Sequence, residues 1–420
     1  MRGLIIILFI SSICGCIQAQ EVVPSLSLKE AEKIFLERNL SLLAERYNMD
    51  LAQAQLRQAR LFDNPVVSLE QNVYNRLNGK YFDVGKEGET IVEIEQVIYL
   101  AGQRNKRVRL EKVNKEMAAY QFEEVLRTLR SELNKTFVEI SFLTRSIDLY
   151  EQEINSLSRL LQVMKEQQKK GNSSLMECAR MEALLLSLRK EKNELENKRV
   201  DRQSELNLLL NLPAEQKMNL LLDDEILKQI EPARLSLADL KSLLALRPDL
   251  KIAQARIAAA RSNLKLQRAL AAPEVSVKGI YDKAGNFINN YFGIGVGISL
   301  PIFNRNQGNI QAAKVGIQQS SQEEVYALEK AQKELYAAYA QLQKAIELFR
   351  SSSTDLESNF HSLREGIDEN FRKRNISMLE FIDYYQSYKE ASLQLDELKK
   401  NVFLAMENLN TLVGQTIFNY

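Results

Sequence analysis

The sequence contains few of the residues that build most catalytic and metal sites. Among its 420 residues there are one histidine, three cysteines and no tryptophan. A single histidine, His361, excludes histidine-based triads and histidine-rich metal sites. Cys14, Cys16 and Cys178 are too few for a disulfide framework or a thiolate zinc cluster. We therefore expect no metal, no cofactor and no enzymatic activity.

Turn-forming residues and an excess of charge are also scarce. Seven prolines and sixteen glycines in 420 residues allow few turns, which favours long helices. Lysine and arginine total 56, and aspartate and glutamate total 55, so the net charge is only +1. Domains that bind nucleic acids carry a clear basic excess. The balance argues against nucleic acid as a partner.

The first residues predict an export signal over 1–19. One arginine precedes an unbroken apolar run at 4–10, which is too short to span a bilayer. Two ways of processing stay open: a lipoprotein-type signal that would make Cys16 a lipidated first residue, or ordinary cleavage after Ala19. An apolar first helix of a cytosolic protein is a third alternative. No run of 18 apolar residues follows, so the sequence predicts no transmembrane helix.

The chain contains an internal sequence repeat of two similar halves. Matching residues recur in the same order, which disfavours the alternative of chance similarity between helices. The matched positions are Leu26-Ser27-Leu28 with Leu235-Ser236-Leu237, Pro65 with Pro273, Ser174 with Ser377, and Glu177 with Glu380. We divide the chain into a first repeat over 20–213, a linker over 214–234, a second repeat over 235–414 and a C-terminal tail over 415–420.

Each half predicts a helix, two strands, a very long helix, a turn and a returning helix. Ser27 with Glu30, and Ser236 with Asp239, are capping boxes that begin the first helices. These helices are expected to end at Asn64 and Ala272, because a residue before proline disfavours helix.

Strands are predicted over 65–98 and 273–301, each strand about ten residues long. Large apolar residues alternate with glycine or serine at 292–300, while Glu93 and Glu95 alternate with apolar residues in the first half. Tilted strands of about this length cross a bilayer. The connections near Asn78-Gly79 and at 284–286 have the composition of hairpin turns. A small soluble sheet packed on helices is the alternative.

The long helices carry a coiled-coil pattern. Residues 103–170 contain neither glycine nor proline, so we expect a helix over 102–169 that is roughly 100 Å long at 1.5 Å per residue. Apolar residues alternate at spacings of three and four, and the second half repeats this pattern. Helical hairpins are predicted over 100–212 and 304–413. A hollow tube and a solid bundle both fit the pattern.

Four strands cannot close a barrel, since even the smallest membrane barrels have about eight. An open sheet in lipid would leave unsatisfied edge groups that cost several kcal/mol each. Membrane strands of this chain would therefore be shared between copies, and three copies would supply twelve. The predicted fold is mainly α with a small β part: a conduit with a pore at one end and a helical tunnel below it.

The chain resembles a known family over essentially all of its mature length, and one stretch carries the most specific part of the resemblance. The segment from Pro301 to Ile310 is similar to the strand-to-helix junction of the CzcC-like branch, the outer-membrane components of heavy-metal efflux pumps, within the TolC family of outer-membrane efflux channels. The junction residues are Pro301, Phe303, Asn304, Arg305, Asn306, Gln307 and Gly308. The first-half counterpart, Leu100-Ala101-Gly102-Gln103-Arg104, departs from the usual Gly-Gly-Lys-Arg form.

The resemblance implies a homotrimer with a trimeric α-barrel and a shared 12-stranded transmembrane β-barrel in outer-membrane lipid. It also implies a periplasmic adaptor (membrane fusion) protein and an inner-membrane RND-type transporter as partners. The expected function is the passive exit duct of a tripartite efflux pump for metal cations or small toxic compounds. A drug-efflux or type I secretion channel of the same fold is an alternative, and a periplasmic coiled-coil scaffold is an alternative of another class.

The resemblance also places functional residues at the helix turns. Glu380 and Asp383 match the positions where acidic rings form a periplasmic gate, although Glu380 also fits a helix cap. The adaptor-contacting tips would be Gly171, Asn172, Ser174, Arg374, Asn375 and Ser377. We expect Cys178 to be a small packing residue. The basic run Arg104, Lys106, Arg107 and Arg109 would meet lipid phosphates or simply be solvated.

Overall fold

The protein is described from a computed structural model, which covers residues 24–172, 174–230, 236–284, 288–352 and 364–420. The predicted export signal, Cys16, the turn residues at 285–286 and His361 lie outside the described residues.

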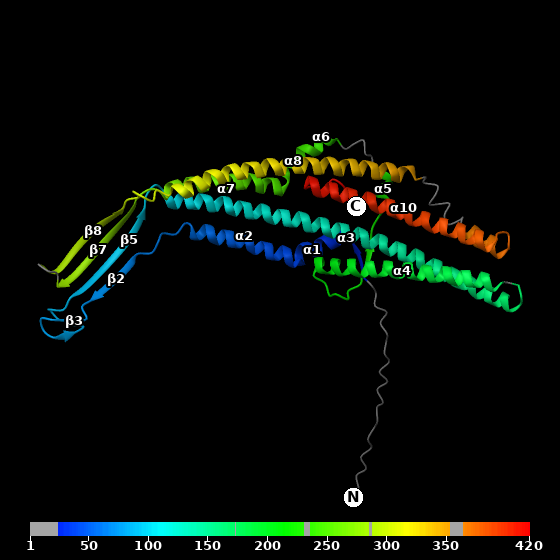
Figure 1. The fold of residues 1–420 in the computed structure, drawn as a ribbon, viewed down its shortest axis with the longest axis horizontal. Helices are drawn as coiled ribbons and strands as arrows, with labels where there is room; N and C mark the ends of the chain where they lie inside the picture. Colours follow the sequence, from blue (N-terminus) through cyan, green and yellow to red (C-terminus); the bar gives the residue numbers. More distant parts are fainter. Residues whose placement is uncertain (1–23, 173, 231–235, 285–287, 353–363) are drawn as a thin grey trace, which may run out of the picture.

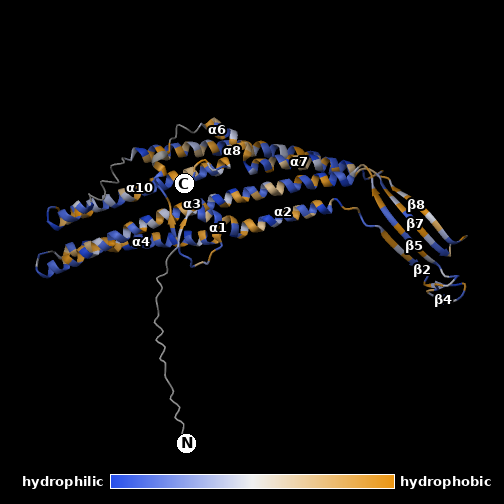
Figure 2. Ribbon diagram, turned by 180° about the vertical axis from the view of Figure 1, so that it is seen from behind, coloured by the Kyte–Doolittle hydropathy of each residue, from blue (hydrophilic) through white to orange (hydrophobic). Residues whose placement is uncertain are grey.

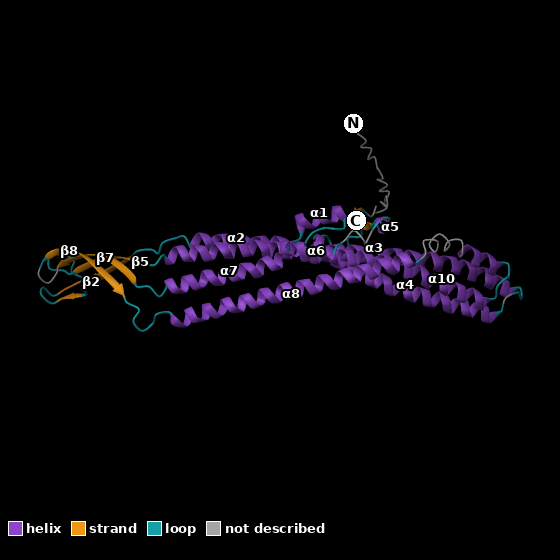
Figure 3. Cartoon of the chain, turned by 90° about the horizontal axis from the view of Figure 1, so that it is seen from above, coloured by secondary structure: helices purple, strands orange, loops and turns teal. Residues whose placement is uncertain are grey.

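The molecule is elongated, with a β-sheet at one end and two helical turns at the other (Figures 1 and 3). The first half contains β1 (Ser25–Ser27), α1 (Leu28–Arg38), α2 (Leu40–Gln58), β2 (Val66–Gln71), β3 (Tyr74–Asn75), β4 (Lys80–Tyr81), β5 (Thr90–Tyr99), α3 (Gln103–Lys169) and α4 (Leu175–Leu210). The remainder contains β6 (Asn219–Leu221), α5 (Ile226–Gln229), α6 (Leu237–Leu243), η2 (Leu244–Leu246), α7 (Pro248–Ala269), β7 (Glu274–Ala284), β8 (Asn289–Ser299), α8 (Gln307–Ser351) and α10 (Met378–Val413). Residues 364–372 are also helical.

Each half begins with a helix that is broken once, at matching positions of the repeat. α1 gives way to α2 at Asn39, whose amide nitrogen donates to the carbonyl of Leu209 at 2.8 Å. In the second half the break lies at Arg247, whose guanidinium donates to the carbonyl of Leu412 at 3.2 Å. Both side chains are buried. Each break is therefore held by the last turn of the returning helix of its own half.

These first helices end earlier than the prolines predict. α2 ends at Gln58 and α7 at Ala269, instead of at Asn64 and Ala272. In the first half the chain turns toward β5, because the carbonyl of Asp63 accepts a bond from Gln96 at 3.1 Å and its carboxylate accepts the Tyr99 hydroxyl. After α2, these contacts hold the segment that leads into β2 against β5.

The sheet has the order β2-β5-β7-β8, and every neighbouring pair is antiparallel. β5 has 10 residues and β7 and β8 have 11 each, but β2 has only 6. The predicted turn at Asn78-Gly79 does not join the two long strands of the first half. It closes a separate small hairpin of β3 and β4, with Gly79 at a φ of 68°.

The two long helices differ. α3 covers 67 residues, one fewer than the predicted range, with Leu133, Ile140 and Leu157 buried. α8 ends at Ser351, so the hairpin predicted over 304–413 is interrupted. The Ser351 hydroxyl donates to a backbone carbonyl one turn earlier, at 2.8 Å. Such serine bonds compete with the helical backbone. The heptad positions predicted at 353–363 lie outside the described residues.

The predicted linker and tail both have structure. Within 214–234, β6 pairs in parallel with β1. In the tail, the Tyr420 hydroxyl donates to the buried Glu407 at 3.0 Å, and the Asn410 side chain accepts the backbone N–H of Ile417 at 2.8 Å. These contacts attach the linker strand β6 to β1 and the C-terminal tail to α10.

Three apolar clusters lie along the helices. One joins α1, α3 and α4 around Phe35 and Phe137. A second joins α8 and α10 around Leu335 and Phe403. The third lies toward the turns around Phe381. Among the described helices, none has an apolar stretch long enough to cross a membrane.

Candidate functional sites along the molecule

One face of the sheet carries most of its large apolar side chains. The register aligns Val67, Ile94, Gly279 and Ile294 in one row across the four strands. Figure 2 shows the hydrophobic residues distributed along these strands. In the single chain this face is uncovered, with Ile294 87% exposed. The alternation predicted from the sequence therefore produces a broad exposed apolar surface.

The opposite face of the sheet carries the charged side chains, together with Ile91, Val97 and Ile280. Glu93 and Glu95 point to this side, and the Lys278 ammonium lies between them, at 2.6 Å and 3.2 Å from their carboxylates. The neighbouring positions on β8 are Gly293, Gly295 and Gly297, and the side chains of Tyr291 and Ser276 fill the space beside the first and the last. A sheet with one apolar and one charged face suits lipid on one side and water on the other.

The two outer strands of the sheet have open edges. Within the described residues, β2 is paired only with β5, and β8 only with β7. Their outward backbone groups are free for pairing with another strand, and a strand added at either edge would continue the sheet.

Both strand-to-helix junctions use the same backbone device. The residue before α3, Gly102, has a φ of 64°, and the residue before α8, Asn306, has a φ of 55°. The Asn306 amide donates to the carbonyl of Gln267 at 2.8 Å, and the Gln103 amide donates to the carbonyl of Ala269 at 3.2 Å. The end of α7 thereby fixes where both long helices leave the sheet.

Two residues of the predicted basic run make contacts at the junction between β5 and α3. The Arg104 guanidinium lies over the Phe62 ring, 3.8 Å from its centre. The Lys106 ammonium donates to the carbonyl of Ala101 at 2.7 Å. These two side chains therefore brace the start of α3 as well as adding positive charge to it.

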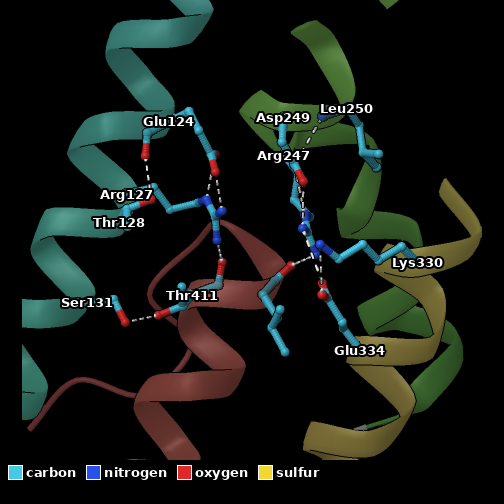
Figure 4. Close-up of polar contacts among 11 residues, drawn as sticks. Glu124, Arg127, Thr128, Ser131, Arg247, Asp249, Leu250, Lys330, Glu334 and Thr411 are labelled. Atoms are coloured by element: carbon cyan, nitrogen blue, oxygen red, sulfur yellow. Dashed lines mark hydrogen bonds and ion pairs between the residues drawn. The ribbon is translucent and has the colours of Figure 1, made fainter. Parts of the chain in front are cut away.

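A polar cavity of about 710 Å³ lies at mid-length, on a surface built by α3, α4, α7, α8 and α10. Figure 4 shows its two central arginines. The Arg127 guanidinium bonds to Glu124 at 2.8 Å and to the carbonyl of Thr411 at 2.7 Å. The Arg247 guanidinium pairs with Asp249 at 2.7 Å. Burial acts to raise the pKa of Asp249, but Arg247 holds it below its usual value.

This cluster was not singled out by the sequence analysis. Arg127 and Arg247 lie in different repeats, and both donate to carbonyls in the last turn of α10. Cations at the C-terminal end of a helix bind its last carbonyl groups and interact favourably with the negative end of the helix dipole. The charge alternation on the helices is visible in the sequence, but nothing in it indicates that these two arginines bind the same end of α10.

The two tip turns are built alike and touch each other. Gly171 and Arg374 occupy matching positions with φ values of 76° and 61°. The next residues, Asn172 and Asn375, each donate their backbone N–H to the carbonyl five residues earlier, at 2.9 Å. The Arg374 guanidinium donates to the carbonyl of Asn172 at 2.6 Å, which joins the turns.

The serines and acidic residues follow these turns. Ser174 with Glu177 and Ser377 with Glu380 both form complete capping boxes, which confirms the capping role of Glu380. The backbone N–H of Ser377 holds the pKa of Glu380 below its usual value. Asp383 lies almost one turn further along α10 and is exposed. Cys178 is buried in the apolar cluster near the turns, as expected for a packing residue.

One buried acid near the tip was missed by the sequence analysis. Glu153 of α3 is 1% exposed, accepts the Tyr385 hydroxyl of α10 and lies 3.5 Å from the Arg364 guanidinium. Burial raises the pKa of Glu153 to about 7, although Arg364 opposes the rise. Its position in the heptad pattern resembles many solvated glutamates, so only the fold identifies it.

Known proteins resemble this chain in sequence and in architecture. A family model described as outer membrane efflux protein matches residues 33–212 and again 240–415. The pyoverdine export outer membrane protein OpmQ of Pseudomonas putida is 25% identical over 293 residues, which are 66% of this chain and 61% of that protein. OpmQ of Pseudomonas aeruginosa is 23% identical over 286 residues, or 67% of this chain and 57% of the relative. The matched part thus spans about three fifths of these relatives.

Solved structures share the fold. CusC superposes with a TM-score of 0.76 at 19% identity, covering 94% of this chain and 93% of the other. The Campylobacter jejuni outer-membrane channel CmeC gives 0.74 at 16% identity, covering 93% and 87%. The double match of the family model agrees with the repeat seen in sequence and structure. The chain therefore belongs to the outer membrane efflux protein family, located in the outer membrane with a large periplasmic helical part.

Proposed function

We propose that three copies of this chain form the passive exit duct of a tripartite efflux pump. The observation that carries the proposal is the sheet: four strands with two open edges, one exposed apolar face and one charged face. Such a sheet satisfies its edges in lipid only by joining others into a closed barrel. Three copies would pool twelve strands around a polar pore.

The helical part would continue the pore as a tunnel. The cavity at mid-length lies on a surface shared by helices of both repeats and is lined by acids and bases in similar number. The wall of a water-filled tube needs charged side chains of this kind, so the surface is compatible with a tunnel.

We propose that the tip is both the gate and the adaptor-docking end. Glu380 and Asp383 of three copies would place six carboxylates at the opening, and concentrated negative charge favours cations. The turn residues Gly171, Asn172, Ser174, Arg374, Asn375 and Ser377 would meet a periplasmic adaptor, which links the duct to an inner-membrane RND-type transporter. The joined turns supply a rigid surface for this contact.

The substrate class has two candidates. The junction from Pro301 to Gly308 resembles the CzcC-like branch and favours metal cations. The relatives named for pyoverdine export favour a small organic compound. Growth of a deletion strain on metals and on drugs, together with its siderophore secretion, decides between them. Loss of metal resistance alone supports the first candidate, and loss of secretion or drug resistance supports the second.

The gate is tested by Asp383→Ala in planar bilayers. We expect larger closed-state conductance and weaker block by trivalent cations, because a carboxylate is lost from each copy at the opening. Glu390→Ala, which removes an exposed carboxylate two turns further along α10, is the matched control. Unchanged conductance together with unchanged trivalent block would refute the role of Asp383.

A further inference from the structure

An apolar loop stands out from one flank of the molecule where β8 ends. Leu300, Ile302 and Phe303 are 63%, 59% and 91% exposed. We call residues 300–303 the hook. The hook is braced, since the N–H of Ile302 donates to the carbonyl of Leu300 at 2.9 Å and the Gln307 amide donates to the carbonyl of Phe303 at 3.3 Å. A fixed loop that exposes three large apolar side chains indicates a binding surface.

The opposite flank carries a cavity of about 570 Å³. Its wall combines Leu61 and Phe62 from the segment after α2 with Ile98 from β5 and Arg104 from α3. The cavity exists because β2 begins at Val66, opposite Glu95, so residues 96–99 have no strand beside them on that flank. We call this the junction cavity.

The hook and the junction cavity lie level with each other on opposite flanks. The register places Tyr99, at the end of β5, in line with Glu274 and with Ser299, at the end of β8. Figure 3 shows α2 and α8 on opposite sides of the molecule with their sheet ends at a similar position along its length. Rotation about a ring axis would bring the hook flank of one copy against the cavity flank of the next.

The open strand edges make this contact continuous with the sheet. β8 runs antiparallel to β2, because three antiparallel steps separate them in the strand order. Pairing β8 with β2 of a second copy would therefore keep the sheet antiparallel. The hook follows directly after β8 and the cavity wall directly precedes β2, so the same pairing sets them side by side. This is a head-to-tail contact that closes a ring.

We propose that Ile302 and Phe303 of one copy insert into the junction cavity of the next copy and lock the ring at the base of the sheet. The proposal rests on the shared barrel proposed above. Burying a phenylalanine side chain that is almost fully exposed stabilises the contact, and one such contact would form between each pair of neighbours.

Cysteine cross-linking tests the contact in the full-length assembly extracted in detergent. The double variant Phe303→Cys with Leu61→Cys should give covalent dimers and trimers under oxidation, and neither single variant should. Phe292→Cys with Leu61→Cys is the matched control, because Phe292 is also exposed but lies at the other end of β8. Absence of cross-links in the first pair, or equal cross-linking in the control, overturns the proposal.

A second measurement does not depend on cysteine chemistry. Phe303→Ala should raise the dissociation of the assembly in mild denaturing detergent roughly tenfold or more, whereas Phe292→Ala should leave it unchanged. If the wild-type protein is trimeric and Phe303→Ala changes nothing, the hook is refuted while the duct stands. If the wild-type protein is monomeric, the proposed duct itself fails. Retention of a phospholipid that is lost in Arg104→Gln, without cross-links, would assign the cavity to lipid and also overturn the proposal.

Discussion

We expect Glu153 to make the region near the tip sensitive to pH. Its carboxyl group is 1% exposed and joins α3 to the second hairpin through Tyr385 and Arg364. Burial raises its pKa from 4.5 to about 7, and the nearby Asp368 adds to the rise while Arg364 opposes it. The folded chain thus holds the proton more tightly than the unfolded chain. The stabilisation is complete below about pH 4.5 and is lost as the pH rises through about 7.

The size of the effect follows from the two pKa values. Each pKa unit corresponds to about 1.4 kcal/mol, so a rise from 4.5 to about 7 corresponds to about 3 kcal/mol. We expect the free energy of local opening at the tip to fall by up to that amount between pH 4.5 and pH 8. In hydrogen exchange this is roughly a hundredfold loss of protection, after correction for the pH dependence of intrinsic exchange.

The assay compares peptides that contain Glu153 and Tyr385 in the detergent-extracted assembly. Glu153→Gln keeps an acceptor for the Tyr385 hydroxyl but cannot ionise, so its protection should vary little with pH. The matched control is Glu151→Gln, which removes an exposed carboxylate that pairs with Lys192 at 3.3 Å. Equal pH dependence of protection in the wild-type protein and in Glu153→Gln would refute the reasoning.

Two further predictions concern the ends of the molecule. Lys278→Met changes the summed charge of Glu93, Glu95 and Lys278 from −1 to −2 in each copy. Bilayer recordings should therefore show a stronger preference for cations. An unchanged reversal potential would contradict the charged inner face. Ser377→Ala removes one capping box and should destabilise the start of α10 by about 1 kcal/mol, seen as faster hydrogen exchange at 378–381. Ser392→Ala, far from the cap, should leave hydrogen exchange at 378–381 unchanged. Equal effects of the two substitutions would argue against the cap.

Most of the fold is readable from the sequence because its signals are local and periodic. The long α3, the capping boxes at Ser27 and Ser377, and the alternation in β5 and β8 depend on residues close together in the chain. The duplication reinforced each of these predictions, since every signal appeared twice.

The errors arose where distant contacts decide the local structure. After the end of α2, Asp63 bonds to Gln96 and Tyr99, more than thirty residues away in the chain. The predicted linker contains β6, a strand that forms by pairing with β1, almost two hundred residues earlier in the chain. Among the sites, Arg127 and Glu153 gain their roles from helices of the other repeat, and Arg247 gains its role from the end of α10, 165 residues away in the chain. Nothing in their own sequence surroundings distinguishes them from solvated residues.

The pooled sheet is tested most directly by single-particle imaging of the detergent-extracted protein viewed along its long axis. The account predicts three copies around an open bore, with β8 of each copy beside β2 of the next. Particles that contain one copy, or a threefold assembly with a filled centre, would contradict it.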